Sequence, residues 1–156
     1  MKRYTDNNKI QKALELLDNL GQKQVFENLN RLSERIQFYD LTLLDYSYKD
    51  NYAVASVDEN NNNVILINEN LQSSPIEAIA SLIAHEAMHV LSKATLEEEI
   101  QATIEEAQVW QLLAYKGNIK DKLVQRENNL LQYLQNGTIR DYITNNDFYK
   151  KEFSNE

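Results

Sequence analysis

The sequence predicts an α+β fold, rich in helix, with a small antiparallel sheet in its first half. Apolar residues recur at helical spacing near both ends of the chain, and β-branched and aromatic residues concentrate between residues 41 and 68. Turns rich in Asp and Asn divide this second region into short segments, as expected for strands. With 156 residues, the chain fits a single domain, residues 1–156, that can bury a substantial core.

Two helices are expected before the sheet. The first begins at a cap, Thr5 or Asp6, and stops at Gly21, and the second runs through Val25 to Ile36. The Asn-rich stretch 60–63 is interpreted as a hairpin tip. The three strands are expected at Leu41 to Tyr48, Tyr52 to Val57 and Val64 to Asn68.

Capping signals predict the helices that follow the sheet. Ser74-Pro75-Ile76-Glu77 has the order of a capping box with proline at the first helical position, and its helix is expected to reach about Leu91. A second box, Thr95-Leu96-Glu97-Glu98, opens a helix that is expected to run to Tyr115 and to stop at Gly117. Two last helices are expected at Asn118 to Gln135 and Thr138 to Lys150, with Gly137 between them and a third cap signal from Thr138 to Asp141.

The composition argues against several classes of protein. The chain is 42% hydrophobic and 26% charged and has no apolar run long enough to cross a bilayer, so a soluble protein without a membrane partner is expected. A net charge of -8 and the lack of a Lys/Arg cluster argue against nucleic acid as a partner. Polar residues follow the basic start where a secretory signal would be apolar, which favours a cytoplasmic location. With zero cysteines, only His and carboxylate side chains are left to bind a metal.

One short run carries the candidate chemistry: His85-Glu86-Ala87-Met88-His89. On an α-helix, histidines four residues apart project from one face, so both imidazoles can bind the same ion. Glu86 lies one step round the helix, where its carboxylate can take a proton from metal-activated water and pass it to a leaving amine. Hydrolysis of a peptide bond requires this combination of groups.

The surroundings of this run favour a metal site over a hydrogen-bonded core cluster. The residues from Ala78 to Leu91 are apolar nearly all round the helix, which predicts that the helix is buried. Burying one carboxylate and two imidazoles costs several kcal/mol unless a partner satisfies them, and a divalent cation satisfies all three. A core cluster of His85, Glu86 and His89 without metal is the alternative.

The third protein ligand must be an acid, because the two histidines of the run are the only ones in the chain. If Glu98 folds back on Thr95 as its capping-box partner, Glu99 faces inward and is the preferred ligand. Glu106 shares the helix face of Glu99 and is a candidate to support the ligands from outside. The candidates for the third ligand, which stay open at this point, are Glu97, Glu98, Glu99, Glu105 and Glu106.

These motifs together resemble the gluzincins, a class of zinc metallopeptidases, and most of all their minimal single-domain members, the minigluzincins. They also resemble the cytoplasmic gluzincins that cleave or relieve transcriptional repressors. The likeness covers about Asn63 to Trp110 and rests on the HExxH run and on Glu99-Ile100-Gln101-Ala102. It implies one Zn²⁺ per chain held by His85, His89 and Glu99, with Glu86 as the general base. It further implies an edge strand along which an extended substrate lies, formed by Val64, Ile65, Leu66, Ile67 and Asn68, unless these residues form a central strand.

The chain departs from the larger gluzincins in two respects. Four residues after the ligand glutamate, where those proteins have an acid, this sequence has Thr103. They also stabilise the oxyanion with a His, Tyr or Arg, for which the candidates here are Tyr115, Tyr46, Tyr48 and Tyr142. By analogy with latent small gluzincins, the C-terminal helices of residues 118–156 are a candidate cleft-covering extension.

Two hypotheses about function follow. The first is a zinc metallopeptidase that acts on a peptide or protein substrate, with Glu86 as general base. The alternative is a latent or non-catalytic zinc-binding domain with a regulatory or protein-interaction role. Thr103 and the unassigned oxyanion donor favour the alternative, whereas Glu86 favours the enzyme because a purely structural zinc site does not need a base.

Overall fold

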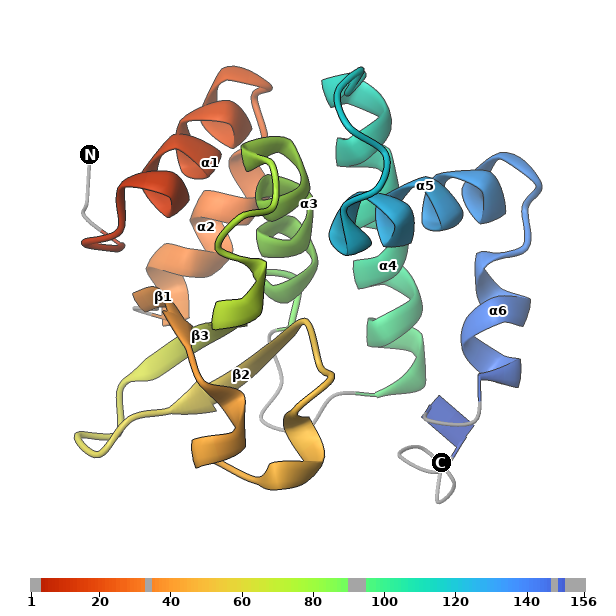
Figure 1. Cartoon of the computed structure of the whole chain (residues 1–156). Helices are drawn as coiled ribbons and strands as arrows, with labels where there is room; N and C mark the ends of the chain where they lie inside the picture. Colours follow the sequence, from red (N-terminus) through yellow and green to blue (C-terminus); the bar gives the residue numbers. More distant parts are fainter. Residues whose placement is uncertain (1–3, 33–34, 90–94, 147–148, 151–156) are drawn as a thin grey trace.

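The computed structural model describes residues 4–32, 35–89, 95–146 and 149–150, and the chain has the α+β fold that the sequence predicts. Helices α1 to α3 and the sheet lie on one side of α4, while α5 and α6 lie on its other side (Figure 1). The helices and strands are α1 (Asn8–Asn19), α2 (Lys23–Leu32), β1 (Arg35–Tyr39), β2 (Ala53–Val57), β3 (Asn63–Asn68), α3 (Ile76–Glu86), α4 (Leu96–Leu113), α5 (Lys122–Gln135) and α6 (Ile139–Asn145).

The sheet is mixed, with β3 in the centre. β1 pairs with β3 in parallel and β2 pairs with it antiparallel, which gives the order β1-β3-β2. Alternate side chains of β3 enter two different cores: Ile65 and Ile67 pack with the helices, while Val64 and Leu66 pack against Leu41 on the opposite face. Burial on both faces explains why the run is apolar throughout instead of alternating.

The sheet was predicted to be antiparallel, which is wrong because β1 pairs with β3 in parallel. Two of the predicted elements are also wrong. Leu41 to Tyr48 forms two 3-10 helices, η1 (Leu41–Leu43) and η2 (Tyr46–Tyr48), and not a strand. The side chains of Asp40 and Asp45 accept hydrogen bonds from the backbone two residues on, which favours turns over strands. Ile36, assigned to the end of the second helix, lies instead in β1. Because β1 pairs with a strand distant in sequence, local alternation does not reveal the parallel pairing.

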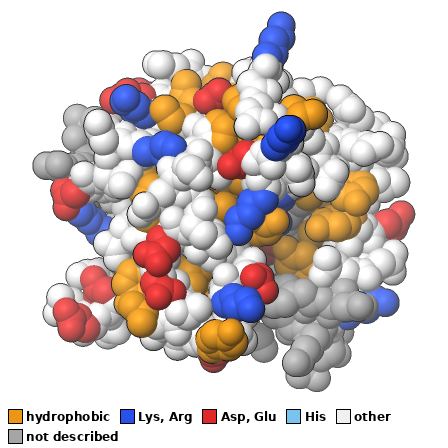
Figure 2. Space-filling model, viewed as in Figure 1, with side chains coloured by type: hydrophobic (Ala, Val, Ile, Leu, Met, Phe, Trp, Pro, Cys, Tyr) orange, Lys and Arg blue, Asp and Glu red, His pale blue; other side chains and the backbone are white. Residues whose placement is uncertain are grey.

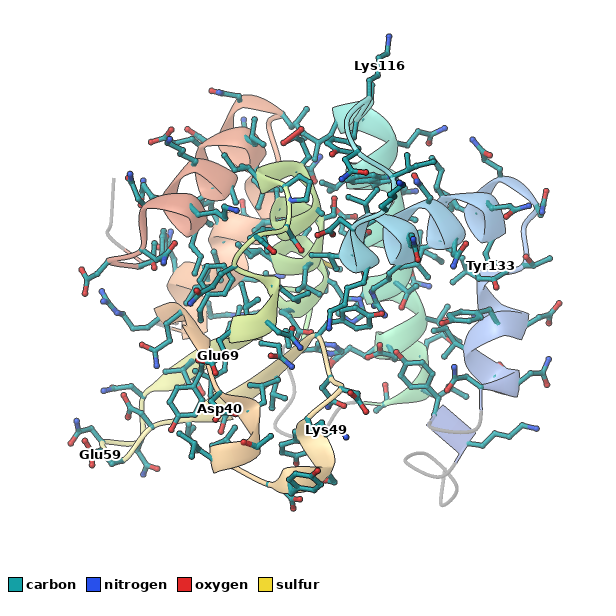
Figure 3. All side chains as sticks on the ribbon, viewed as in Figure 1. Asp40, Lys49, Glu59, Glu69, Lys116 and Tyr133 are labelled. Atoms are coloured by element: carbon teal, nitrogen blue, oxygen red, sulfur yellow. The ribbon has the colours of Figure 1, made fainter. Side chains whose placement is uncertain are left out.

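The hairpin between β2 and β3 is confirmed. Asp58 organises its tip by accepting hydrogen bonds from the backbone of Asn60 and Asn62, each at 2.9 Å. Asn61 takes the left-handed conformation with φ 65°, which asparagine tolerates better than most residues. The tip, marked by Glu59, points away from the body of the molecule (Figure 3).

The first two helices lie close to their predicted places, but the first cap is different. Asn7, and neither Thr5 nor Asp6, caps α1 by accepting a hydrogen bond from the backbone of Ile10. Gly21 follows the helix in the left-handed conformation, as a stop signal requires.

Helix α3 begins one residue later than predicted, at Ile76, and ends earlier. Its N-cap position is Pro75, and the Ser74 hydroxyl bonds the carboxylate of Asp121 at 3.0 Å instead of capping α3. The α-helix ends at Glu86, after which the backbone N–H groups of Met88 and His89 bond carbonyls only three residues back. Leu91, the predicted end, lies outside the described residues.

Helix α4 begins as predicted, because the Thr95 hydroxyl accepts a hydrogen bond from the Glu98 backbone at 3.1 Å. The Glu98 side chain does not complete the capping box and contacts His89 instead. The helix ends at Leu113, before Ala114 in the left-handed conformation, and so short of the predicted Tyr115.

The C-terminal region has the two predicted helices with different starts. Asp121 caps α5 by accepting hydrogen bonds from the backbone of Leu123 and Val124. Gly137 separates α5 from α6 as expected, with φ +68°. Thr138 holds the N-cap position of α6, as predicted, but its side chain makes no capping bond and its hydroxyl donates to the Tyr133 carbonyl. The prediction that this helix reaches Lys150 includes residues 147–148, which lie outside the described part.

Two hydrophobic cores meet at α4. The larger core lies between the helices before the sheet, one face of the sheet, α3, and parts of α4 and α5. It includes Trp110. The smaller core lies between α4, α5 and α6 and includes Ile100 and Ile139. α4 is therefore buried on two sides, and polar side chains on its inner face must find partners inside the protein.

In the described part of the chain, no helix has the length and apolar character to span a membrane. On the face shown in Figure 2, Lys and Arg side chains are interspersed with Asp and Glu and do not merge into one basic area. The expected absence of nucleic-acid and membrane partners stays a prediction.

Candidate metal centre

Helix α3 presents the HExxH run to α4. His85 and Glu86 are the last residues of α3, and His89 lies in the tightened turn that follows. This turn brings the two imidazole rings to 5.2 Å between centroids, edge to face. His85 is 3% exposed and Glu86 8%. The predicted burial of this polar run is confirmed.

Glu99 on α4 joins the two histidines. Its Oε1 lies 3.1 Å from His85 Nε2, and its Oε2 lies 3.2 Å from His89 Nε2. One ligand atom from each residue can be chosen so that all three lie within 4.8 Å of one another. Two nitrogens and one carboxylate oxygen that converge in this way can hold a divalent cation with a position left open, as in catalytic zinc sites.

The remaining nitrogen of each imidazole contacts a second carboxylate. His85 Nδ1 lies 2.8 Å from Glu106 Oε1, and His89 Nδ1 lies 2.9 Å from Glu98 Oε1. Acids in these places orient the imidazoles so that each Nε2 faces the ligand position. Among the open candidates, Glu98 and Glu106 therefore lie behind the histidines, and Glu99 lies between them.

Thr103 occupies the position where a supporting acid was expected, four residues after Glu99. The acid that contacts the histidine lies one turn later in α4. Thr103 donates its hydroxyl to the backbone carbonyl of Glu99 at 2.8 Å, inside the helix. Glu106, seven residues after Glu99 and on the same face, contacts His85. Helical periodicity places positions seven apart almost in register, so Glu106 as a supporting acid was accessible from the sequence.

The two other acids of α4 lie elsewhere. Glu97 is bound by Arg140 at the surface, where both side chains are 59% exposed. The carboxyl of Glu105 is partly buried, which raises its pKa above the ordinary value. Neither joins the cluster that the histidines form with Glu99.

Burial and neighbouring charges determine the protonation of the cluster. Burial alone would lower the pKa of His85, but the charges of Glu99 and Glu106 raise it well above its ordinary value. Burial likewise opposes a charged His89, yet hydrogen bonding to Glu99 and the Glu86 charge raise its pKa. The pKa of Glu99 is held far below its usual range by both imidazoles, against the effect of burial. The acids around the two imidazoles thus favour positive charge at this position.

Glu86 differs from the other acids in its electrostatics. Burial raises the pKa of its carboxyl, and the charges of His85 and His89 offset the rise only in part. A carboxyl with a raised pKa is better matched to accepting and returning a proton near neutral pH.

A second buried charge group stands behind Glu106. Arg126 of α5 donates two hydrogen bonds of 3.1 Å to the Glu106 carboxylate, from Nε and Nη2. Its Nε also lies 3.9 Å from Oε1 of Glu127, which is fully buried. Burial and the adjacent Glu106 charge raise the pKa of Glu127 well above its ordinary value, which favours the neutral form of this carboxyl. The sequence offers no local signal for this group, because its members come from two helices.

Tyr149 interacts with the cluster and was not among the tyrosines expected from the sequence. Its hydroxyl hydrogen-bonds to Glu99, and burial followed by the Glu99 charge raises the pKa of the hydroxyl. Tyr115 instead donates to the Asn118 carbonyl, and Tyr46 is 72% exposed on η2. Tyr142 stacks on Tyr133 at 4.6 Å between centroids. No periodicity distinguishes Tyr149 from the other tyrosines of the chain.

The predicted substrate strand is corrected by the sheet order. Val64 to Asn68 belong to β3, which has a neighbour on each side and offers no free edge. The edge strands are β1 and β2, and part of the outer side of β1 is taken, because the Ile36 backbone donates to the Tyr4 carbonyl. β2 is the other edge strand of the sheet. The apolar run in β3 arises from burial on both faces, not from contact with a peptide.

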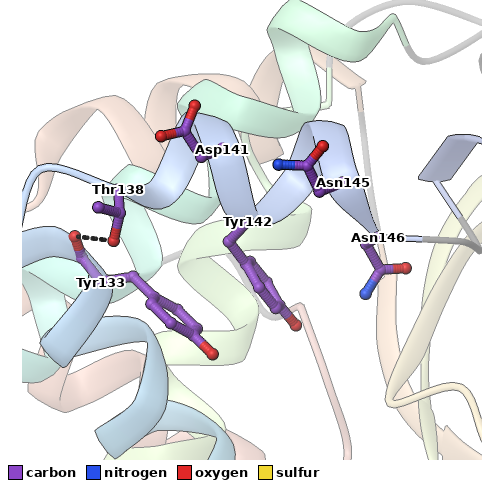
Figure 4. A pocket seen from close by; sticks show the side chains of 6 residues that line it. All are labelled: Tyr133, Thr138, Asp141, Tyr142, Asn145 and Asn146. Carbon is purple, nitrogen blue, oxygen red and sulfur yellow. Dashed lines mark hydrogen bonds between the residues drawn. The ribbon is translucent and has the colours of Figure 1, made fainter.

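A surface pocket of about 440 Å³ lies between the end of α5 and α6 (Figure 4). It is lined by Tyr133, Thr138, Asp141, Tyr142, Asn145 and Asn146. None of these residues belongs to the histidine–carboxylate cluster, so the pocket is not part of the candidate metal centre.

No protein-family model, curated protein or solved structure matches this chain. The likeness to gluzincins therefore depends on the motifs and on the geometry described above.

Proposed function

We propose that the protein is a zinc-dependent metallopeptidase of the gluzincin type, with His85, His89 and Glu99 as zinc ligands. The observation that carries the proposal is the convergence of both Nε2 atoms on the Glu99 carboxylate while both Nδ1 atoms contact other acids. In a core cluster without metal, the two nitrogens of each imidazole would not need different kinds of partner. The donor set of two nitrogens and one oxygen, without thiolate, is typical of catalytic zinc.

Zinc held there would polarise a substrate carbonyl and lower the pKa of a coordinated water toward about 7. Glu86 accepts a proton from the attacking water and delivers it to the leaving amine as the peptide bond breaks. The raised pKa of its carboxyl suits it to both transfers. Glu98 and Glu106 keep the imidazoles turned toward the ligand position.

Tyr149 is our candidate for the oxyanion donor, in place of the four tyrosines expected from the sequence. Its hydroxyl contacts Glu99, at the cluster itself. A phenol donor near the ligand position can hydrogen-bond to the oxygen that becomes negative in the transition state. Replacing Tyr149 with Phe should lower kcat with little change in zinc content, whereas a loss of zinc would show that the hydroxyl serves only to hold Glu99.

For the substrate we propose an extended peptide that pairs with β2. β2 is an edge strand, and an edge strand can offer backbone groups to a peptide of any sequence. Tyr52, directly before β2, contacts Arg126, which in turn binds Glu106 behind His85. These contacts connect the start of β2 to the cluster and support β2 as the substrate strand. The cytoplasmic location expected from the sequence stays a prediction.

A specific observation favours the alternative, a latent or non-catalytic zinc-binding domain. His85, Glu86 and Glu99 are each less than a tenth exposed, and the Tyr149 hydroxyl interacts with Glu99. A substrate carbonyl would need space that these side chains fill. The position of Glu86 still favours the enzyme, because a structural site gains nothing from a buried base.

The test is metal content followed by cleavage of a diverse peptide library. Zinc near one per chain, with peptide cleavage that is lost in Glu86→Gln, would support the peptidase. Zinc near one per chain without cleavage would favour the non-catalytic domain. No bound metal, even after zinc is added back, would mean that the histidines and Glu99 form a core cluster and would overturn both.

A further inference from the structure

Arg126 is the residue through which the C-terminal helices reach the cluster. It comes from α5, and both of its hydrogen bonds go to the carboxylate of Glu106 on α4. Glu106 has no exposed side-chain surface, and the Arg126 side chain is 15% exposed. The two hydrogen bonds fix the Glu106 carboxylate in one orientation.

The position of Glu106 matters because of its other contact. Its Oε1 lies 2.8 Å from His85 Nδ1, while His85 Nε2 lies 3.1 Å from Oε1 of Glu99. A carboxylate held beside Nδ1 fixes the ring orientation in which Nε2 faces the ligand position.

Glu127 is the third buried group beside Arg126. Its Oε1 lies 3.9 Å from Arg126 Nε, whereas both oxygens of Glu106 accept hydrogen bonds from the guanidinium at 3.1 Å. The two hydrogen bonds of Arg126 therefore go to Glu106.

We propose that Arg126 is a positioning residue of the metal centre, which holds the Glu106 carboxylate against His85 and so sets the affinity for zinc. The guanidinium of Arg126 also lies over the ring of Tyr52, with Cζ 4.6 Å from the ring centroid. Tyr52 directly precedes β2, so the same residue connects the proposed substrate edge to the metal ligands. The proposal rests on the zinc site proposed above. It also gives α5 a role in that site, in contrast to the cleft-covering extension expected for residues 118–156.

The chain supplies a matched control for the experiment. Arg140 binds Glu97 of the same helix with two hydrogen bonds, at 2.8 and 2.9 Å, in the same bidentate manner. That pair is 59% exposed on both sides and contacts neither histidine. Exposed pairs contribute little to stability, so Arg140→Gln tests what loss of a bidentate Arg–Glu pair does by itself.

The experiment measures the zinc dissociation constant by competition with a chelator for wild type, Arg126→Gln, Glu106→Gln, the double variant and Arg140→Gln. We expect Arg126→Gln to weaken zinc binding by about 10- to 100-fold, as for other residues that support metal ligands. Arg140→Gln should leave the constant unchanged. In the Glu106→Gln background, replacing Arg126 should have little further effect, because its partner has already been neutralised.

Other results would overturn the proposal in distinguishable ways. Wild-type zinc binding with equal constants for Arg126→Gln and Arg140→Gln would refute the role of Arg126 and leave the zinc site intact. Additive effects of Arg126→Gln and Glu106→Gln would show that Arg126 does not act through Glu106. Absence of zinc from the wild type would refute the site itself. If circular dichroism shows that Arg126→Gln does not fold, Arg126→Lys replaces it in the cycle, and full wild-type affinity in that variant would refute the need for a bidentate guanidinium.

Discussion

The two histidines of the candidate site lie in different surroundings. His85 belongs to α3, its side chain is 4% exposed, and its supporting acid, Glu106, is completely buried and bound by Arg126. His89 lies just past the end of α3 with a side chain that is 12% exposed, and its supporting acid, Glu98, is 11% exposed in the first turn of α4. The same contact between an acid and Nδ1 is thus made once in the interior and once near the surface.

The difference indicates that the two halves contribute unequally to the centre. Charges in the interior interact strongly and are costly to leave unpaired, whereas charges near water are screened. We therefore expect the His85 half to provide most of the rigidity of the site, and the His89 half to tolerate change. Four experiments test whether the His85 half and the His89 half contribute unequally.

The largest effect is expected from Glu99→Ala, which removes the residue that joins the two halves. Two histidines alone are too few for a catalytic zinc site, so the variant should retain essentially no metal. Mass spectrometry of the purified protein measures this, with Glu97→Ala as the control from the same turn of α4. The assignment of Glu99 fails if the two variants lose zinc equally.

The next effect compares the supporting acids directly. Glu106→Gln should weaken zinc binding by about 10- to 100-fold, the usual result of losing such a partner. Glu98→Gln should have a smaller effect, because water can reach His89 and replace the lost acceptor. Both constants come from chelator competition. An equal or larger loss in Glu98→Gln would contradict the view that the His85 half dominates.

Proton release on zinc binding provides a third test. The pKa values of His85 and His89 are raised, so both imidazoles carry protons that the metal must displace. Zinc affinity should therefore fall as the pH falls, and binding at about pH 7 should release protons. Calorimetry in buffers with different ionisation enthalpies measures the number. Glu106→Gln should lower it, since Glu106 helps to raise the pKa of His85, and no change in that variant would count against the coupling.

The smallest effect concerns the first turn of α4, which carries Glu98. Thr95→Ala removes the hydroxyl that caps the helix and should lower the free energy of unfolding by about 1 kcal/mol. Thr138→Ala is the control, because Thr138 holds the same position in α6 without a capping bond. Urea denaturation of the metal-free protein compares the two variants. Equal losses would mean that the cap of α4 does not contribute more than an ordinary surface hydroxyl.

Features with a local cause were predicted well. The α+β class, the hairpin between β2 and β3 and the cap at Thr95 follow from periodicity and turn chemistry, and the structure confirms them. His85, His89 and Glu99, which the sequence analysis grouped together, do lie close to one another, although His89 lies past the end of α3 and not on the predicted helix. Their role as zinc ligands stays a prediction.

Features that join distant parts of the chain were missed. Ile36 of β1 was assigned to a helix, since the pairing of β1 with β3 is parallel and long-range. The edge position of β3 was implied only by the family resemblance, and the apolar run itself does not distinguish an edge strand from a central one. The cap expected at Ser74 failed because Ser74 bonds Asp121, 47 residues further on. Tertiary contacts override local propensity where a polar group has a better partner elsewhere.

By itself, the sequence determined which side chains have the chemistry for a metal centre and on which helix face they stand, because helical spacing is a local property of the backbone. Only the tertiary structure decided which acid lies between the histidines and which lie behind them. It also brought Arg126 and Tyr149 to the site from the C-terminal region. The physical reason is that ionised groups in the interior must find partners, and those partners are chosen by proximity in the folded chain and not by distance along the sequence.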